Sequence, residues 1–251
     1  MIPGLVAHRG QMSSYPENSL PALEAALRAG GCWLEFDVQM TSDGELVLLH
    51  DADLRRTAGQ DVSIFDLDGK AATAVSVHES ARFGERFAPT LLPTLKQALD
   101  LISAHPQATA FVEIKRQSLQ RWGCATVIER LLEVLEGHGS QCVVISFEAE
   151  AIEAIRSKSK LKTGWVLRNY DDHHHRQAQS IEPNWLILNH KKIPRGVDPW
   201  KGDWKWMLYD ITDPSLALEW GSHGVELIET ADIEAMLKDP KLATRGCEDG
   251  P

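Results

Sequence analysis

Two apolar runs with a helical pattern between them decide the fold: Leu5-Val6-Ala7-His8 and Trp33-Leu34-Glu35-Phe36-Asp37-Val38, on either side of Leu20-Pro21-Ala22-Leu23-Glu24-Ala25-Ala26-Leu27. In the middle segment leucines recur every three or four positions, as on one face of a helix. Asn18 or Ser19 is a suitable N-cap, and Gly30 is a typical C-terminal stop. A strand, a helix and a second strand in this order indicate a βα unit of a parallel sheet.

The same alternation continues along the chain. It gives eight candidate strands, at Leu5–His8, Trp33–Val38, Ala110–Lys115, Cys142–Ser146, Lys162–Leu167, Trp185–Leu188, Trp206–Tyr209 and Val225–Glu229. Further helices are expected after Thr94, around residues 128–135 and after Asp213-Pro214, whereas residues 189–204 carry little helical signal. Eight units in about 250 residues predict the α/β class and a (β/α)8 TIM barrel.

We expect one domain over residues 1–251, with a small insertion after the second strand unit at about residues 52–92. That segment contains several glycines and only short apolar pieces. A turn at Thr41-Ser42-Asp43-Gly44 and a returning strand over residues 46–50 should bring His50 back toward the barrel.

Composition excludes several classes of protein. Hydrophobic residues make up 43% and charged residues 25% of the chain, which is ordinary for a globular protein. The net charge of −10 argues against nucleic-acid binding and against binding to anionic membranes. No apolar stretch is long enough to span a membrane, and the start of the chain leaves no room for a secretory leader. Cys32, Cys124, Cys142 and Cys247 form no C-x-x-C pair, so we expect buried thiols and a cytoplasmic protein; the oligomeric state is open.

Charged side chains gather at the predicted strand ends, where a barrel of this type places its active site. Glu35 and Asp37 are two apart on one strand, so they share a face, and Glu113 lies on the next. Two unscreened carboxylates at about 4 Å repel by about 4 kcal/mol at an effective dielectric of 20. A divalent cation removes that repulsion, and all-oxygen ligation favours Mg²⁺ or Ca²⁺ over zinc. The alternative, ordinary charges on an edge strand, fits poorly with the apolar residues that flank both acids.

His8 and His50 can divide general-acid and general-base work near neutral pH. The alternative is a pair of hydrogen-bonded core histidines. Arg9 and Lys115 would bind a phosphoryl group, with Glu17 as a third candidate for substrate binding, or would form structural salt bridges with Glu17 and Glu113.

Weaker candidates lie farther along the chain. Asn189, His190 and Lys191 follow the sixth strand and are second-rank candidates for substrate contact. Three successive histidines at 173–175 diverge on any regular element and cannot share one metal ion. The tryptophans at 200, 204 and 206 suit core packing better than cation-π contact with a quaternary ammonium group.

The motifs together closely resemble the glycerophosphodiester phosphodiesterase family, in particular its short bacterial members. They are His8-Arg9-Gly10, Pro16-Glu17-Asn18-Ser19, Glu35-Phe36-Asp37-Val38, Thr41-Ser42-Asp43-Gly44, His50-Asp51 and Glu113-Ile114-Lys115. The resemblance is tight over residues 5–57 and loose over the rest of the chain. Tyr209-Asp210 and Thr230-Ala231-Asp232-Ile233 depart from the family pattern of Val-Asn and Thr-Asp-Xaa-Pro.

The resemblance implies a (β/α)8 barrel with an insertion, a divalent cation on Glu35, Asp37 and Glu113, acid and base at His8 and His50, and phosphate contacts from Arg9 and Lys115. The implied reaction is metal-dependent hydrolysis of small-molecule glycerophosphodiesters to sn-glycerol 3-phosphate and an alcohol. Two alternatives are a phospholipase D-like lyase that stops at a cyclic phosphate and a non-catalytic phosphodiester-binding protein.

Overall fold

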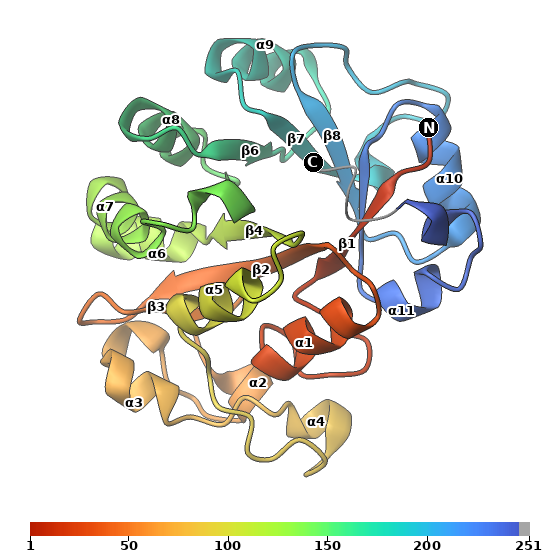
Figure 1. Ribbon diagram of the computed structural model, residues 1–251. Helices are drawn as coiled ribbons and strands as arrows, with labels where there is room; N and C mark the ends of the chain where they lie inside the picture. Colours follow the sequence, from red (N-terminus) through yellow and green to blue (C-terminus); the bar gives the residue numbers. More distant parts are fainter. Residues whose placement is uncertain (246–251) are drawn as a thin grey trace.

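Eight parallel strands close a ring in the computed structural model, which describes residues 1–245 (Figure 1). The ring closes where β1 pairs with both β2 and β9. Its strands are β1 (Gly4–His8), β2 (Trp33–Met40), β4 (Thr109–Ile114), β5 (Cys142–Ser146), β6 (Lys162–Val166), β7 (Trp185–Asn189), β8 (Lys205–Tyr209) and β9 (Leu227–Thr230). The predicted (β/α)8 barrel and all eight of its strands are confirmed.

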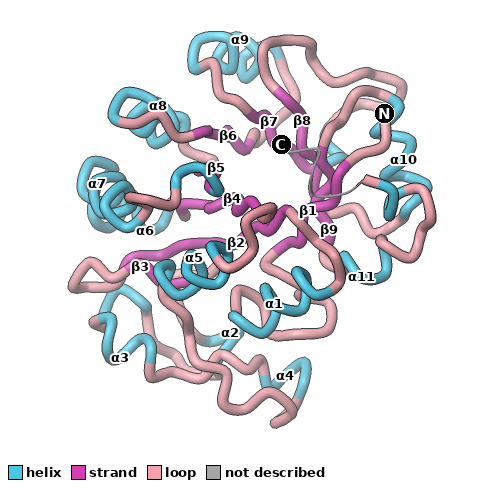
Figure 2. The backbone as a smooth tube through the Cα atoms, viewed as in Figure 1, coloured by secondary structure: helices cyan, strands magenta, loops and turns pink. Residues whose placement is uncertain are grey.

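Helices surround the ring (Figure 2). They are α1 (Leu20–Arg28), α5 (Leu95–Ser103), α6 (Arg116–Trp122), α7 (Cys124–Val134), α8 (Ala149–Lys158), α9 (Asp172–Ile181), α10 (Pro214–Ser222) and α11 (Ile233–Met236). The side chain of Ser19 caps α1, Thr94 forms a capping box with Gln97 at α5, and Pro214 opens α10. Between β7 and β8 the chain forms only a short 3₁₀ turn, His190–Lys192, as the weak helical signal predicted.

Alternation along β2 sorts its side chains between two environments. Leu34, Phe36 and Val38 join the large apolar layer between strands and helices. Trp33 points the opposite way, into a second cluster inside the barrel. Because Glu35 and Asp37 have the same parity as Trp33, they also face the barrel interior.

The insertion leaves the ring after β2. Strand β3 (Leu46–Leu48) pairs antiparallel with β2, and α2 (Arg55–Ala58), α3 (Gly69–Thr73) and α4 (Ser80–Phe83) follow. These elements lie beside α1 and α5 (Figure 1). The returning strand ends at Leu48, two residues earlier than predicted. The insertion has a separate apolar cluster, made of Val47, Leu49, Leu54, Ile64, Ala72, Val77 and Leu92.

The cysteine prediction is only partly confirmed. Cys124 and Cys142 are free thiols, and burial raises the pKa of Cys142 to about 12. Cys32 is disulfide-bonded, so the expectation of a thiol there is wrong. Cys247 lies outside the described residues. Among residues 1–245, no helix combines the length and apolar character needed to cross a bilayer.

Candidate active site

A cavity of about 220 Å³ opens at the carboxyl ends of the barrel strands. Its wall contains both candidate histidines, acids from three strands and several apolar side chains. The lining residues are His8, Arg9, Asp37, His50, Glu113, Lys115, Ile145, Phe147, Val166, Ile187, Tyr209, Asp210 and Glu229. A larger cavity of about 590 Å³ lies between residues 190–197 and α10, but none of the clustered acids lines it. The smaller cavity is therefore where chemistry can occur.

The three acids predicted as metal ligands lie close together, and two of them, Asp37 and Glu113, line this cavity. Asp37 and Glu113 are register partners on neighbouring strands, and Glu35 lies two residues before Asp37. One oxygen from each of the three lies within 4.8 Å of the others. Burial and the charge of Asp37 raise the pKa of Glu35 well above its usual range, and burial also raises the pKa of Glu113. Burial would raise the pKa of Asp37 too, but Lys115 and Arg9 hold it well below its usual range.

This donor set fits a hard divalent cation. Oε1 of Glu35 is buried and has no hydrogen-bond partner among the described residues, although a buried carboxylate oxygen normally has one. The ammonium group of Lys115 carries one positive charge that two of these acids share, with Nζ 3.0 Å from Asp37 Oδ1 and 2.6 Å from Glu113 Oε1. Clustered carboxylate oxygens at an open cavity are the ligands that Mg²⁺ and Ca²⁺ prefer.

Glu229 is a fourth buried acid, which the sequence analysis did not single out. It lies on β9, and Oε1 is 3.2 Å from Nε2 of His8. With His8 and Glu35 it forms a second compact group within 4.8 Å. Burial and the charge of Glu113 raise its pKa well above the usual range. Its position at the end of the last predicted strand was the available signal.

The two histidines reach the cavity from different elements. His8 ends β1, and burial together with the charge of Arg9 lowers its pKa to about 3. His50 follows β3, and its Nδ1 lies 2.7 Å from Asp51 Oδ1. Burial lowers the pKa of His50 as well. Both imidazoles therefore hold a proton less tightly than an exposed histidine does.

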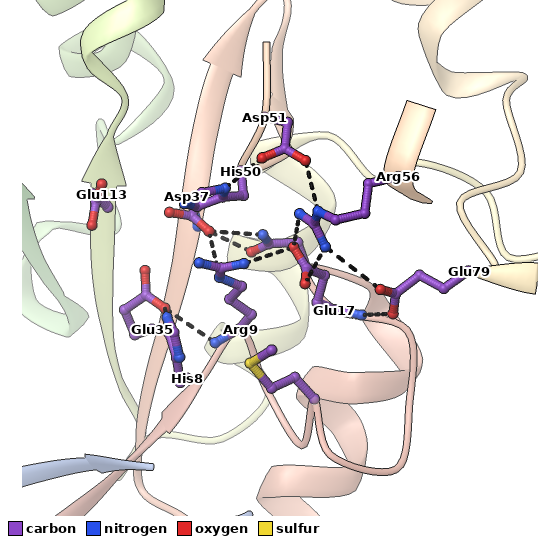
Figure 3. Close-up of polar contacts among 12 residues, drawn as sticks. His8, Arg9, Glu17, Glu35, Asp37, His50, Asp51, Arg56, Glu79 and Glu113 are labelled. Carbon is purple, nitrogen blue, oxygen red and sulfur yellow. Dashed lines mark hydrogen bonds and ion pairs between the residues drawn. The ribbon is translucent and has the colours of Figure 1, made fainter. Parts of the chain in front are cut away.

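The loop after β1 holds Asp37 with two residues in left-handed backbone conformations, Arg9 and Asn18, both at φ +52°. Nε of Arg9 is 3.0 Å from Asp37 Oδ2, and NH1 donates to Glu17 at 2.9 Å (Figure 3). Asn18 donates to Asp37 Oδ2 and accepts from the Asp37 amide. Asn18 is thus not the helix cap, which is Ser19.

Glu17 lies behind Arg9, buried and outside the cavity lining. It accepts two hydrogen bonds from Arg56, which the sequence analysis did not identify. Among the second-rank candidates, Asn189 donates to Asp210, which lines the cavity. His190 and Lys191 line the larger cavity instead.

The remaining candidates have packing roles. His174, on α9, contacts Asp171. Trp200 stacks on Tyr170 with ring centroids 4.1 Å apart. All three tryptophans pack in or against the layer between strands and helices, as the packing interpretation predicts.

Comparison with known proteins gives consistent results. A probable glycerophosphodiester phosphodiesterase 1 of Mycobacterium tuberculosis is 34% identical over 63% of this chain and 62% of its own length. A glycerophosphodiester phosphodiesterase of Caldanaerobacter subterraneus is 35% identical over 39% of this chain and 40% of its own length. The chain therefore spans about two fifths to three fifths of the length of these two curated relatives.

Solved structures match over nearly the whole chain. A phosphodiesterase of Oleispira antarctica, in complex with the product sn-glycerol-3-phosphate, has a TM-score of 0.80 at 22% identity and covers 99% of this chain and 98% of its own. A putative glycerophosphoryl diester phosphodiesterase of Silicibacter pomeroyi has a TM-score of 0.80 at 19% identity, covering 97% and 94%. The sequence model of the glycerophosphoryl diester phosphodiesterase family matches residues 8–225. This chain belongs to that family.

Proposed function

We propose that the protein is a metal-dependent phosphodiesterase that hydrolyses glycerophosphodiesters, such as glycerophosphocholine or glycerophosphoethanolamine, to sn-glycerol 3-phosphate and an alcohol. The observation that carries this proposal is a cluster of three buried acids, two of which line a cavity of about 220 Å³ together with both imidazoles. Family membership supports the reaction class. We also propose a cytoplasmic location.

Glu35, Asp37 and Glu113 would hold the cation, either Mg²⁺ or Ca²⁺. When bound, such an ion neutralises negative charge that develops on the non-bridging phosphate oxygens. The protein has a net charge of −10, so an anionic substrate needs a locally positive site. Arg9 and Lys115 line the cavity and would contribute that charge, with Arg9 able to bind phosphate oxygens in a bidentate manner.

His8 and His50 would divide the proton transfers. One imidazole takes a proton from the nucleophile, and the other donates one to the departing alkoxide. The lowered pKa of both rings supports proton acceptance at neutral pH. Because Asp51 engages Nδ1 of His50, we assign proton transfer to Nε2 of that ring.

Turnover of glycerophosphocholine with and without a chelator tests the proposal. Release of glycerol 3-phosphate should stop after treatment with EDTA and return when Mg²⁺ or Ca²⁺ is added. Phosphorus NMR of the products separates hydrolysis from a lyase, because a lyase accumulates a cyclic phosphate. Full activity after exhaustive chelation would contradict metal dependence, and binding without turnover would indicate a non-catalytic protein.

A further inference from the structure

Arg56, the second residue of α2, connects two separate parts of the candidate site. Its Nε lies 2.7 Å from Asp51 Oδ2, and the other oxygen of Asp51 contacts Nδ1 of His50. On its other side, NH1 and NH2 each donate to Glu17 at 2.7 Å, and Glu17 accepts from Arg9 (Figure 3). One guanidinium group from the insertion thus lies between the contacts of His50 and those of Arg9.

The geometry requires an arginine. Both oxygens of Glu17 are bound by the two terminal nitrogens of Arg56, while Nε remains for Asp51. A lysine ammonium is a single point and cannot make this planar arrangement. The side chain of Glu17 is only 3% exposed, so its charge depends on the two arginines for compensation.

The insertion holds Arg56 in place independently of the cavity. Leu54 packs in the apolar cluster of the insertion, and the carbonyl of Thr57 accepts from the amide of Glu79. Glu79 is buried at φ +50°, and its carboxylate accepts from the Glu17 amide and from Arg82. The insertion is therefore attached to the loop that carries Glu17 through Arg56, Glu79 and Arg82.

We propose that Arg56 is a positioning residue, which orients His50 through Asp51 and Arg9 through Glu17. The proposal rests on the function proposed above, since it assigns proton transfer to His50 and phosphate binding to Arg9. It gives the insertion a role in setting the geometry of both groups. Arg56 itself does not line the cavity, and we do not assign it any contact with the substrate.

Steady-state kinetics with glycerophosphocholine test this role. Arg56→Ala should lower kcat/KM by about 10²-fold, because misplacement of a catalytic group by about 1 Å has an effect of that size. Both parameters should change, kcat through His50 and KM through Arg9. Arg55→Ala is the matched control: Arg55 is the adjacent residue, 66% exposed, and its side chain pairs with the exposed Asp61. Arg55→Ala should leave both parameters unchanged.

A second variant separates positioning from general support of the insertion. Arg82 pairs with Glu79 and with the carbonyl of Met12, but with neither Asp51 nor Glu17. Arg82→Ala should lower Tm with a much smaller loss of kcat than Arg56→Ala. Added guanidinium ion should restore part of the turnover of Arg56→Ala and none in Arg82→Ala. Equal losses of kcat in the two variants would overturn the proposal.

The imidazole of His50 provides a readout that does not depend on activity. Nitrogen-15 NMR should show the Nδ1–H tautomer in the wild type and a mixture of tautomers in Arg56→Ala. An unchanged tautomer together with wild-type kinetics in Arg56→Ala would refute the positioning role alone. A wild-type protein that never cleaves the diester would refute the proposed function instead, and the tautomer would still test Arg56.

Discussion

Two groups of acids meet at Arg9, and their charge balance differs. Four buried acids on the barrel strands form what we call the strand group: Glu35, Asp37, Glu113 and Glu229. The nearby cations are Lys115 and Arg9. Three acids on the loops form what we call the loop group, and each is in a close ion pair with an arginine. The pairs are Glu17 with Arg9, Asp51 with Arg56 and Glu79 with Arg82.

The pKa values of the three strand glutamates are raised and that of Asp37 is lowered, whereas the pKa values of Glu17 and Asp51 on the loops are both lowered. In the strand group, burial and mutual repulsion raise the pKa of Glu35 and Glu229. In the loop group, Arg56 and Arg9 lower the pKa of Glu17, and hydrogen bonds with His50 and Arg56 lower the pKa of Asp51, although burial opposes both shifts. The strand group therefore has more acids than nearby cations and suits a metal ion, whereas each acid of the loop group is paired with an arginine and suits positioning.

One histidine lies beside each group, and substitution of either should have the largest effect on turnover. His8→Ala and His50→Ala should each lower kcat by about 10²–10⁴-fold, as for general acid–base groups. His190→Ala is a suitable control, because His190 lines the other cavity. Steady-state turnover of glycerophosphocholine measures the effect. Near-normal kcat in either variant would remove that histidine from the mechanism.

A divalent cation should stabilise the strand group and leave the loop group unaffected. Saturation at 100 times Kd contributes about 2.7 kcal/mol, or about 5–10 °C in Tm for a protein of this size. A carboxyl group with a raised pKa in the folded state destabilises the fold above its ordinary pKa, so the contribution of Glu35 to the stability of the cation-free protein falls as pH rises from about 4.5.

Protons also compete with the cation for these acids. The shift in Tm should therefore be larger at pH 8 than at pH 5, and Glu35→Gln should abolish it. Calorimetry with Mg²⁺ and Ca²⁺ measures it. A shift of equal size in Glu35→Gln would place the cation elsewhere.

Neutralising one acid in each group should change stability in opposite directions. Without added cation, Glu17→Gln should destabilise the protein by about 1–3 kcal/mol, because two arginines lose a charged acceptor. Glu229→Gln should stabilise it by about 1 kcal/mol by relieving repulsion. Urea unfolding of the two variants measures both. Destabilisation of similar size in both would contradict the distinction between the groups.

The smallest expected effect is on the pH dependence of kcat/KM. Burial lowers the pKa of His50, while its contact with Asp51 raises it in part. The acidic limb of kcat/KM should therefore lie below pH 6.5, and Asp51→Asn should move the limb to lower pH by less than about one unit. An upward shift in this variant would contradict the contact between Asp51 and His50.

The sequence identifies three of the four acids in the strand group, but not Glu229 or the arginine contacts of the loop group. Glu35, Asp37 and Glu113 lie on strongly apolar strands, whose parallel pairing brings them together. Arg56 and Glu79 reach Glu17 across 39 and 62 residues, through an insertion without regular periodicity. Helix α9 was also missed, since only Ala178 and Ile181 are buried along it. The left-handed backbone at Arg9 has no local signal, because arginine seldom adopts this conformation.

Anomalous diffraction from crystals soaked in Mn²⁺, a substitute for Mg²⁺, tests the central claim most directly. The account predicts one strong peak within coordinating distance of Glu35, Asp37 and Glu113, with His8 and His50 on the same cavity. A peak on the loop group, or none at the strand group in fully soaked crystals, would contradict it.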